Sequence, residues 1–353
     1  TYTGATTVSA GTLQIGDGGT TGSLSTSSAI TNNGTLAFNR IDTITQGTGF
    51  NSVISGTGAV TQAGSGTLVL NGVNTYTGTT TISAGTLQIG AGGTTGSLSS
   101  SSAITNNGTL SFNRSNTVTQ GTDFNSVISG TGAVTKAGSG TLTLNGANTY
   151  AGATTVSAGI LNLRNAAGLG TTAGSTTVSN GATLQLQDDI KVGAEALSLN
   201  GGAASGQTGA LVNVSGTNTY GGAVTVTASS SISAASGSVL NLTGGVVKNG
   251  TVATFNGGGT INVNTVAISG SSANSDLVID GATVNLDVAN TYNGPTYLRN
   301  GGVLAANVVG ALPATTRSAV IMDDTGAGSS TLSLTASQLI ASLTGAADSL
   351  VSL

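Results

Sequence analysis

The sequence contains no cysteine and no histidine, few charged residues and only two prolines. Without cysteine the chain cannot be a disulfide-stabilised scaffold or carry a thiolate nucleophile. Without histidine it lacks the commonest general base and a common metal ligand, so the usual serine triad cannot be built. Only 6% of the residues are charged and the net charge is −4, so we expect no nucleic-acid partner.

Long apolar runs are also absent from the sequence. No stretch approaches the roughly 18 consecutive apolar residues that a membrane-spanning helix needs, so we expect no membrane insertion by this chain. The sequence opens at Thr1 within a repeated motif, without methionine or a signal peptide. We therefore expect that the chain was processed or excised from something longer.

Glycine, serine, threonine and branched apolar residues are abundant instead. There are 57 glycines and 37% apolar residues, whereas good helix formers are scarce: Glu195 is the only glutamate. This composition favours strands and turns over helices. A disordered chain would hold more charge and fewer β-branched apolar residues. The composition therefore predicts an ordered all-β protein.

One stretch, residues 64–90, shows a pattern that recurs with variations in the rest of the chain. It contains the alternating runs Thr67–Leu70 and Thr86–Ile89, each bracketed by glycines. Alternation places Leu68 and Leu70 on one face of a strand, while the glycines supply tight turns. The stretch predicts a strand–turn–strand unit.

An internal duplication governs the architecture. Residues 1–74 align without a gap on residues 75–148 with 12 substitutions, which indicates that one unit was copied. A Thr-Tyr pair then recurs along the chain at intervals of 74, 74, 70 and 72 residues. We expect one continuous array over residues 1–353, divided into the units 1–74, 75–148, 149–218, 219–290 and 291–353.

Each unit divides further into rungs of roughly 20–30 residues, which is typical of a solenoid. One rung cannot bury its own leucine and isoleucine side chains, whereas stacked rungs line them into an interior column and pair their backbones at about 4.8 Å. Stacking also suits ladders of Asn, Thr and Ser, and it penalises like charges. We expect an all-β parallel β-solenoid with about 14 rungs, on the order of 70 Å long.

A long motif supports this expectation. The pattern Gly-x-Gly-Thr-Leu-x-Leu-x-Gly-x-Asn-Thr-Tyr-x-Gly-x-Thr-Thr-[Val/Ile]-x-x-Gly-x-Leu stands at residues 64–87 and again at 138–161, where Ile160 replaces the threonine before the leucine. It resembles the autotransporter-associated β-strand repeat, also called the passenger-associated transport repeat. The resemblance implies a right-handed parallel β-helix in a passenger that is extracellular or lies at the outer-membrane surface of a Gram-negative bacterium. It implies an export route and a shape but no particular activity.

Carboxylates are the candidates for catalysis, because glycoside cleavage needs two of them about 5–10 Å apart. The candidates are Asp188 with Asp189 (near Lys191 and Glu195, which would suit lyase chemistry), Asp276 with Asp280 and Asp287, and Asp323 with Asp324. Neither duplicated unit carries a matching cluster, and aspartate is common in turns. We favour solvated turn residues, and we expect no catalytic residue, no cofactor and no enzyme activity.

Two glycine-rich patterns could suggest ligand loops. Residues 16–19 match a calcium-binding nonapeptide poorly, and Asp17 becomes Ala91 in the second copy, so we expect no metal site. Residues 56–58 and 64–66 begin like GxGxxG but lack the glycine at the sixth position. They predict turns rather than phosphate loops.

Aromatic residues and Asn-Gly pairs recur with the repeat. The tyrosines either form an exposed row that stacks on sugars or pack under the adjacent loop with locally bonded hydroxyls, and we favour the second interpretation for Tyr2, Tyr76, Tyr150, Tyr220 and Tyr292. We expect interior positions for Phe38, Phe112, Phe50 and Phe124. The Asn-Gly-Thr pattern is a glycan acceptor but first a turn signal, and it stands at Asn33, Asn107 and Asn249.

These observations support three functional hypotheses. The first is a non-enzymatic extracellular structural rod (a stalk, spacer or adhesive fibre), since the duplication copies no polar cluster. The second is a self-assembling filament subunit, because uncapped solenoid ends present unpaired strand edges. The third is a polysaccharide-active enzyme. The expected partners are a host or neighbouring-cell surface, a matrix polysaccharide and further copies of the chain.

Overall fold

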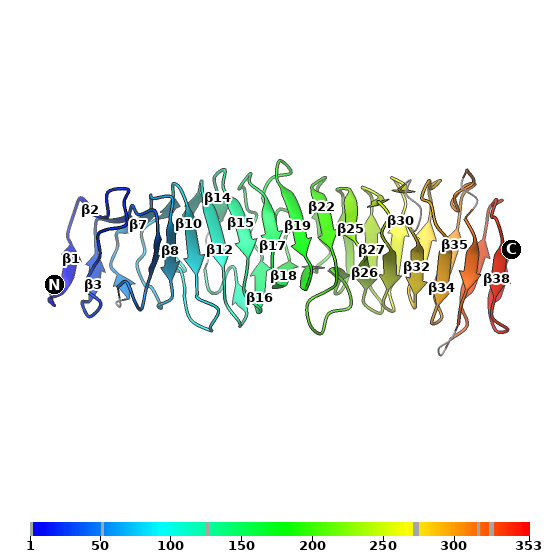
Figure 1. The fold of residues 1–353 in the computed structure, drawn as a ribbon, viewed down its shortest axis with the longest axis horizontal. Coiled ribbons are helices and arrows are strands. Elements are labelled where there is room, and N and C mark those ends of the chain that lie inside the picture. Colours follow the sequence, from blue (N-terminus) through cyan, green and yellow to red (C-terminus); the bar gives the residue numbers. More distant parts are fainter. Residues whose placement is uncertain (1–2, 51–52, 125–126, 271–274, 316–317, 325–327) are drawn as a thin grey trace. The chain divides into compact units, whose positions relative to one another are not determined.

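The computed structural model describes residues 3–50, 53–124, 127–270, 275–315, 318–324 and 328–353. In this part of the chain the regular structure is short β-strands, and no helix is present (Figure 1). Consequently, no helix of the described residues is long and apolar enough to cross a membrane. The strands pair in parallel with strands of the next rung, so the predicted all-β parallel solenoid is confirmed. The described residues form about 15 rungs.

The strands fall into two compact units, one formed by residues 1–162 and 167–174 and the other by residues 163–166 and 175–353. We describe each unit by itself. Whether the whole chain forms one continuous array of five repeat units stays a prediction.

The first unit has three main sheets of stacked strands. One sheet contains β1 Thr6–Val8, β3 Ile30–Asn32 and β6 Ile54–Ser55. A second contains β2 Thr12–Ile15, β4 Thr35–Phe38, β7 Ala59–Gln62, β9 Thr80–Ile82, β11 Ile104–Asn106 and β14 Ile128–Ser129. A third contains β5 Thr43–Thr45, β8 Thr67–Leu70, β10 Thr86–Ile89, β12 Thr109–Phe112, β15 Ala133–Lys136 and β17 Thr154–Val156. In addition, β13 Val118–Thr119 pairs with β16 Thr141–Leu144, and β18 is Gly159–Leu163.

The second unit also has three sheets. One contains β19 Ser175–Ser179, β22 Ala196–Asn200, β25 Val224–Ala228, β28 Val246–Lys248 and β31 Ile268–Ser269. Another contains β20 Ala182–Leu186, β23 Leu211–Asn213, β26 Ser230–Ala234, β29 Ala253–Asn256, β32 Leu277–Asp280, β34 Thr296–Arg299, β36 Val320–Met322 and β38 Leu343–Gly345. The last contains β21 Lys191–Val192, β24 Thr217–Tyr220, β27 Val239–Leu242, β30 Thr260–Val263, β33 Thr283–Leu286, β35 Val303–Ala306, β37 Thr331–Leu334 and β39 Leu350–Ser352.

Aliphatic side chains stack in register through the interior. In the first unit Leu68 is the register partner of Leu87, which in turn pairs with Leu110, and all three are buried. In the neighbouring sheet Leu13 and Leu36 are partners in the same way. Each fully buried leucine stabilises the fold by about 1.5–3 kcal/mol relative to an exposed one. The interior columns predicted from the alternating pattern are therefore confirmed.

An amide ladder runs along the second unit, as expected for stacked rungs. Asn262 donates from Nδ2 to Oδ1 of Asn241 at 2.8 Å. Asn285 donates to Oδ1 of Asn262 at the same distance. These residues occupy matching positions on β27, β30 and β33, so parallel stacking supplies each amide with a partner.

The duplicated unit does not return to the side of the solenoid on which it began. Strand β2 lies in the second sheet of the first unit, whereas its copy β10 lies in the third. Rungs are also shorter than a third of the repeat in places, since the partners Leu68 and Leu87 are separated by 19 residues while Ile30 and Ile54 are separated by 24. A repeat of 74 residues therefore holds three rungs and one further strand, which explains why the chain has more rungs than predicted.

Candidate functional site

The asparagine before each Thr-Tyr pair ties one rung to the previous one. Its Oδ1 accepts a hydrogen bond from the backbone N–H of an isoleucine at the start of a strand or next to one, at 3.0, 3.0, 2.7 and 2.6 Å for Asn74, Asn148, Asn218 and Asn290 respectively. The four asparagines are buried. A buried N–H left without an acceptor costs about 1–3 kcal/mol. The Asn-Thr-Tyr sequence, called the mark below, therefore has a structural role.

The tyrosine of the mark has a structural role as well. Tyr76, Tyr150 and Tyr292 are fully buried, and each hydroxyl lies 2.6–2.7 Å from Oγ1 of the threonine four residues later. A sugar-stacking row is therefore excluded for these positions, and packing with a local hydroxyl partner is confirmed. Tyr2 lies outside the described residues.

Tyr220 departs from this pattern. Val224 stands where the other units have the threonine, and the buried Tyr220 hydroxyl has no hydrogen-bond partner among the described residues. Burial raises the pKa of Tyr220 well above its ordinary value, and the nearby Glu195 raises it further. The hydroxyl therefore stays protonated near neutral pH and cannot act as a general base there.

Besides the tyrosines, the described residues include one carboxylate and two ammonium groups inside the rungs, which the sequence did not predict. Glu195 accepts a hydrogen bond from Thr176 Oγ1 at 2.5 Å, and burial raises its pKa to about 7. Burial lowers the pKa of Lys136 to about 8 and that of Lys248 to about 7. Buried groups with such shifts are candidates for function.

The partners of these groups are structural. Lys136 donates to the carbonyl oxygens of Gly138 and, at 3.1 Å, Ala158. Lys248 donates to the Ser275 carbonyl oxygen, and its ammonium lies 4.5 Å from the centroid of the Tyr292 ring. Each lysine thus satisfies carbonyl groups of its own or the next rung.

The first group of predicted carboxylates forms a turn. Asp188 and Asp189 have φ angles of 71° and 58°, a left-handed conformation that aspartate tolerates in turns. Asp188 lies 3.1 Å from Nε of Arg164, and Asp189 accepts a hydrogen bond from the backbone of Thr217 at 2.5 Å. Glu195 is buried and therefore does not join them at the surface.

The other carboxylates are engaged with neighbouring rungs. Asp280 and Asp287 accept hydrogen bonds of 2.6 Å from the side chains of Asn300 and Asn307. They lie at the ends of β32 and β33, which belong to different sheets. The structure therefore separates these two carboxylates instead of pairing them. Asp276 is half-buried and contributes a favourable charge to Lys248.

One column of charges does assemble on the outer face of the second unit. Arg299 is the register partner of Asp280, and its Nε lies 3.7 Å from Oδ2 of Asp323. Its guanidinium also lies 4.7 Å from the centroid of the Tyr297 ring. Because an arginine lies between two carboxylates, opposite charges alternate along this column and favour stacking of the rungs. Asp324 is bonded to the Ser330 backbone and hydroxyl at 2.7 and 2.5 Å.

The glycine-rich patterns are tight turns. A Cβ atom at Gly66 would lie 2.1 Å from the carbonyl oxygen of Asp42 on the previous rung, so glycine is needed for close packing rather than for phosphate. Asp17 is exposed, and the described residues contain no cluster of three carboxylate, histidine or cysteine side chains that could hold a metal ion.

The remaining sequence predictions concern aromatic packing and Asn-Gly turns. The four phenylalanines are buried in two ring pairs with centroids 5.3 and 5.2 Å apart: Phe38 with Phe50, and Phe112 with Phe124. The Asn33 and Asn107 side chains each accept a hydrogen bond of 3.1 Å from the backbone of a threonine on the next rung. Asn249 is exposed next to a bend.

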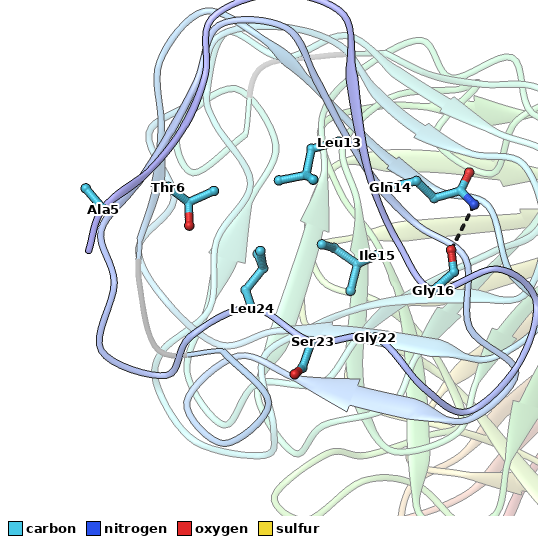
Figure 2. A pocket seen from close by; sticks show the side chains of 9 residues that line it. All are labelled: Ala5, Thr6, Leu13, Gln14, Ile15, Gly16, Gly22, Ser23 and Leu24. Atoms are coloured by element: carbon cyan, nitrogen blue, oxygen red, sulfur yellow. Dashed lines mark hydrogen bonds between the residues drawn. The ribbon is translucent and has the colours of Figure 1, made fainter. Parts of the chain in front are cut away.

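An apolar hollow of about 460 Å³ lies beside β1 and β2. Figure 2 shows Leu13, Ile15 and Leu24 around the open space, while Gln14 turns away and donates to the Gly16 carbonyl oxygen at 2.8 Å. Leu13 is only half-buried. In the second copy the matching Leu87 is 1% exposed because β8 covers it.

Two hydroxyl-lined grooves occupy matching positions in the two copies of the duplicated unit. The first hydroxyl groove, of about 560 Å³, is lined chiefly by Thr3, Ser23, Ser25, Thr26, Ser27 and Thr48. The second hydroxyl groove, of about 420 Å³, is lined chiefly by Thr77, Ser97, Ser99, Ser100, Ser101 and Thr122. The expectation that the duplication copies no polar cluster is therefore wrong. Serine and threonine are so frequent in this sequence that only the fold distinguishes these positions.

Comparison with known proteins agrees with the repeat pattern. The passenger-associated transport repeat matches residues 1–15, 60–89, 134–163 and 280–306. The chain is 36% identical over 218 residues to the adhesin BmaC autotransporter of Brucella suis biovar 1 (strain 1330), a match that covers 45% of this chain and 6% of the adhesin. No solved structure matches the chain. The resemblance inferred from the sequence is thus confirmed: the chain carries passenger-associated transport repeats and is similar over part of its length to an autotransporter adhesin.

Proposed function

We propose that this chain is a non-enzymatic structural element, serving as a stalk, spacer or adhesive fibre, of an extracellular or outer-membrane-surface protein of a Gram-negative bacterium. The observation that carries the proposal is the use of buried polar groups to join rungs. The asparagine of each mark bonds the backbone of the previous rung. At the surface, candidate carboxylates also bond neighbouring rungs. Similarity to an autotransporter adhesin supports the adhesive role and the location.

Deleting residues 75–148 from the surface-displayed protein tests this proposal. The deletion joins Asn74 to Thr149 and so restores the Asn-Thr-Tyr mark, and we expect the β-sheet circular dichroism and the cooperative unfolding transition to persist. Adhesion to host cells should fall gradually with length and not be abolished. Loss of the fold, or complete loss of adhesion from a folded deletion variant, would contradict a spacer.

The enzymatic alternative has its own measurement. Wild-type chain incubated with a panel of plant, bacterial and host polysaccharides should release no reducing or unsaturated sugars. Release that disappears in Asp188→Ala or Asp323→Ala would establish an enzyme and overturn the proposed structural role.

Self-association is a second candidate function, favoured by apolar side chains that are half-buried or exposed in each unit. In the first unit Leu13 borders the hollow of Figure 2. In the second unit Leu350 and Val351 on β39 are 55% and 38% exposed. Sedimentation velocity over a hundredfold range of concentration should reveal filaments that Leu13→Asp and Val351→Asp abolish. A monomer throughout that range would rule out assembly.

A further inference from the structure

We propose that each of the two hydroxyl grooves binds a short stretch of a neutral polysaccharide. The inference rests on the proposed role of the chain at a bacterial surface. It adds the class of ligand and the location of the binding sites. Grooves of about 420 and 560 Å³ fall within the usual size of small-ligand sites. Their occurrence at eight matching positions of a duplicated unit means that the copying preserved the groove together with the fold.

The chemistry of the lining selects the ligand class. Serine and threonine hydroxyls each offer one donor and two acceptor lone pairs, as the hydroxyl groups of a sugar do. Neither lining contains a lysine or an arginine, so a polyanion would find no counter-charge there. Leu24 and Leu98 are only 6% and 3% exposed, whereas Val73 adds an exposed apolar side chain to the second groove, against which the apolar face of a sugar ring can pack. A neutral polymer that both donates and accepts hydrogen bonds fits this lining.

The groove walls are held in place before any ligand arrives. In the second groove the backbone of Ser97 is fixed by Asn74, whose Nδ2 donates to the Ser97 carbonyl oxygen at 3.2 Å. Ser99 Oγ accepts a hydrogen bond from the Ser101 backbone at 3.2 Å. Arg114 anchors the preceding loop through the carbonyl oxygens of Thr94 and Gly96 at 2.6 and 2.8 Å. Such preorganisation lowers the entropic cost of binding.

Three exposed hydroxyls of the second groove are available to a ligand. Ser100, Ser101 and Thr122 are exposed, and the structure gives their hydroxyl groups no hydrogen bond to another described residue. Water is their default partner, and a ligand hydroxyl can replace it without leaving a polar group unpaired. Because the loops of the two grooves follow β2 and β10, which lie in different sheets, the grooves act as separate sites.

Two of the eight matching positions differ between the grooves: Thr26 is Ser100 in the second copy, and a glycine is replaced by an aspartate. Asp123 lines the second groove where Gly49 lines the first. Its Oδ2 accepts a hydrogen bond from the Thr119 backbone at 2.7 Å, which orients the carboxylate at the groove. Hydrogen bonds from sugar hydroxyls to a carboxylate are roughly twice as strong as those to a neutral acceptor. The second groove should therefore bind the oligosaccharide about tenfold more tightly than the first groove does.

Isothermal titration of the whole chain with neutral oligosaccharides cut from dextran, a β-glucan and a mannan tests the proposal, with heparin as the anionic probe. At least one neutral probe should bind with a stoichiometry of two per chain, and heparin should not bind. The triple variant S99A/S100A/S101A should reduce the stoichiometry to one. Adding S25A/T26A/S27A should abolish binding, while Asp123→Gly should weaken the tighter site about tenfold.

A matched control removes three threonine hydroxyls outside the grooves, Thr61→Ala, Thr81→Ala and Thr105→Ala, which are register partners on β7, β9 and β11. This control should bind like the wild type, and all variants should keep its unfolding midpoint. Absence of binding by every neutral probe, or equal binding by the groove variants and the control, would overturn the proposal. Sugar release by the wild type would instead overturn the non-enzymatic function and leave the binding site intact.

Discussion

At the scale of single residues, buried polar side chains explain both what the sequence predicts and what it misses. The Asn-Thr-Tyr mark has a recognisable sequence because its asparagine and tyrosine side chains are both buried and hydrogen-bonded at one corner, so its structural role could be predicted. Glu195 and Lys248 occur once each without a repeated neighbour, and nothing in their local sequence separates an inward from an outward position. Only the stacking register assigns Lys248 to the interior, as the partner of Val226.

The unpartnered Tyr220 hydroxyl leads to a prediction. In Val224→Thr the new hydroxyl stands where Thr80 and Thr296 serve the matching tyrosines, so we expect the free energy of unfolding to rise by about 1 kcal/mol. Urea unfolding measures it. The reverse change, Thr296→Val, should cost about 1–2 kcal/mol because it leaves the Tyr292 hydroxyl without this partner. A destabilised Val224→Thr would show that the hydroxyl cannot reach Tyr220.

At the scale of elements, alternation and glycine spacing predict the strands, because only one face of each strand can enter the interior. The columns of Leu68 and Leu87 or of Leu13 and Leu36 follow from this pattern alone. The hydroxyl grooves cannot be predicted from this pattern, because they depend on which loops lie next to each other in the fold. Ser99 and Thr122 are distant in sequence, and their approach is set by the lengths of the rungs between them.

Two substitutions between the copies are coupled through a loop and a strand. A Cβ atom at Gly49 would lie 2.8 Å from Cγ1 of Ile44. In the second copy Asp123 takes the place of Gly49, and Val118 takes the place of Ile44. Valine keeps the Cγ1 atom but lacks the Cδ1 atom of isoleucine, so we expect it to shift aside more readily and the two changes to be coupled.

A double-mutant cycle tests this coupling. Gly49→Asp alone should destabilise the chain by about 1–3 kcal/mol through overpacking, and Ile44→Val alone should cost about 0.5–1.5 kcal/mol. The double variant should be more stable than the sum of these losses predicts, with a coupling energy above about 0.5 kcal/mol. If the changes in the free energy of unfolding were strictly additive in urea unfolding, the proposed coupling would be contradicted.

At the scale of the whole molecule, the repeat length and the rung length do not match. A unit of 74 residues looks like three rungs when only its Thr-Leu runs are counted, which gives about 14 rungs for the chain. The sheets show instead that β10 has moved to the sheet next to that of its copy β2. The sequence reveals the period of the duplication, but the angle through which each copy turns depends on how many strands form one rung.

The buried ionisable groups give the chain an unusual dependence of stability on pH. The pKa of Glu195 is raised to about 7, so the folded state binds the proton more tightly than the unfolded state. Its stabilising contribution is complete below the ordinary glutamate pKa of about 4.3 and is lost as the pH rises through 7. The pKa of Lys248 is lowered to about 7, so the unfolded state binds its proton more tightly. Its contribution is complete above the ordinary lysine pKa of about 10.4 and is lost as the pH falls through that range to 7.

Both losses are complete near neutral pH, and we therefore expect these two groups to give the second unit a stability minimum there, whereas most proteins are most stable between about pH 5 and 8. Thermal unfolding followed by circular dichroism at pH 5, 7 and 9 should give the lowest midpoint at pH 7. Glu195→Gln should remove the rise toward pH 5, because its amide cannot ionise, and Lys248→Met should remove part of the rise toward pH 9. Lys136, with a pKa lowered to about 8, belongs to the first unit and should affect only the alkaline side of that unit's transition. A maximum at pH 7 that neither variant changes would mean that Glu195 and Lys248 reach water in the folded chain.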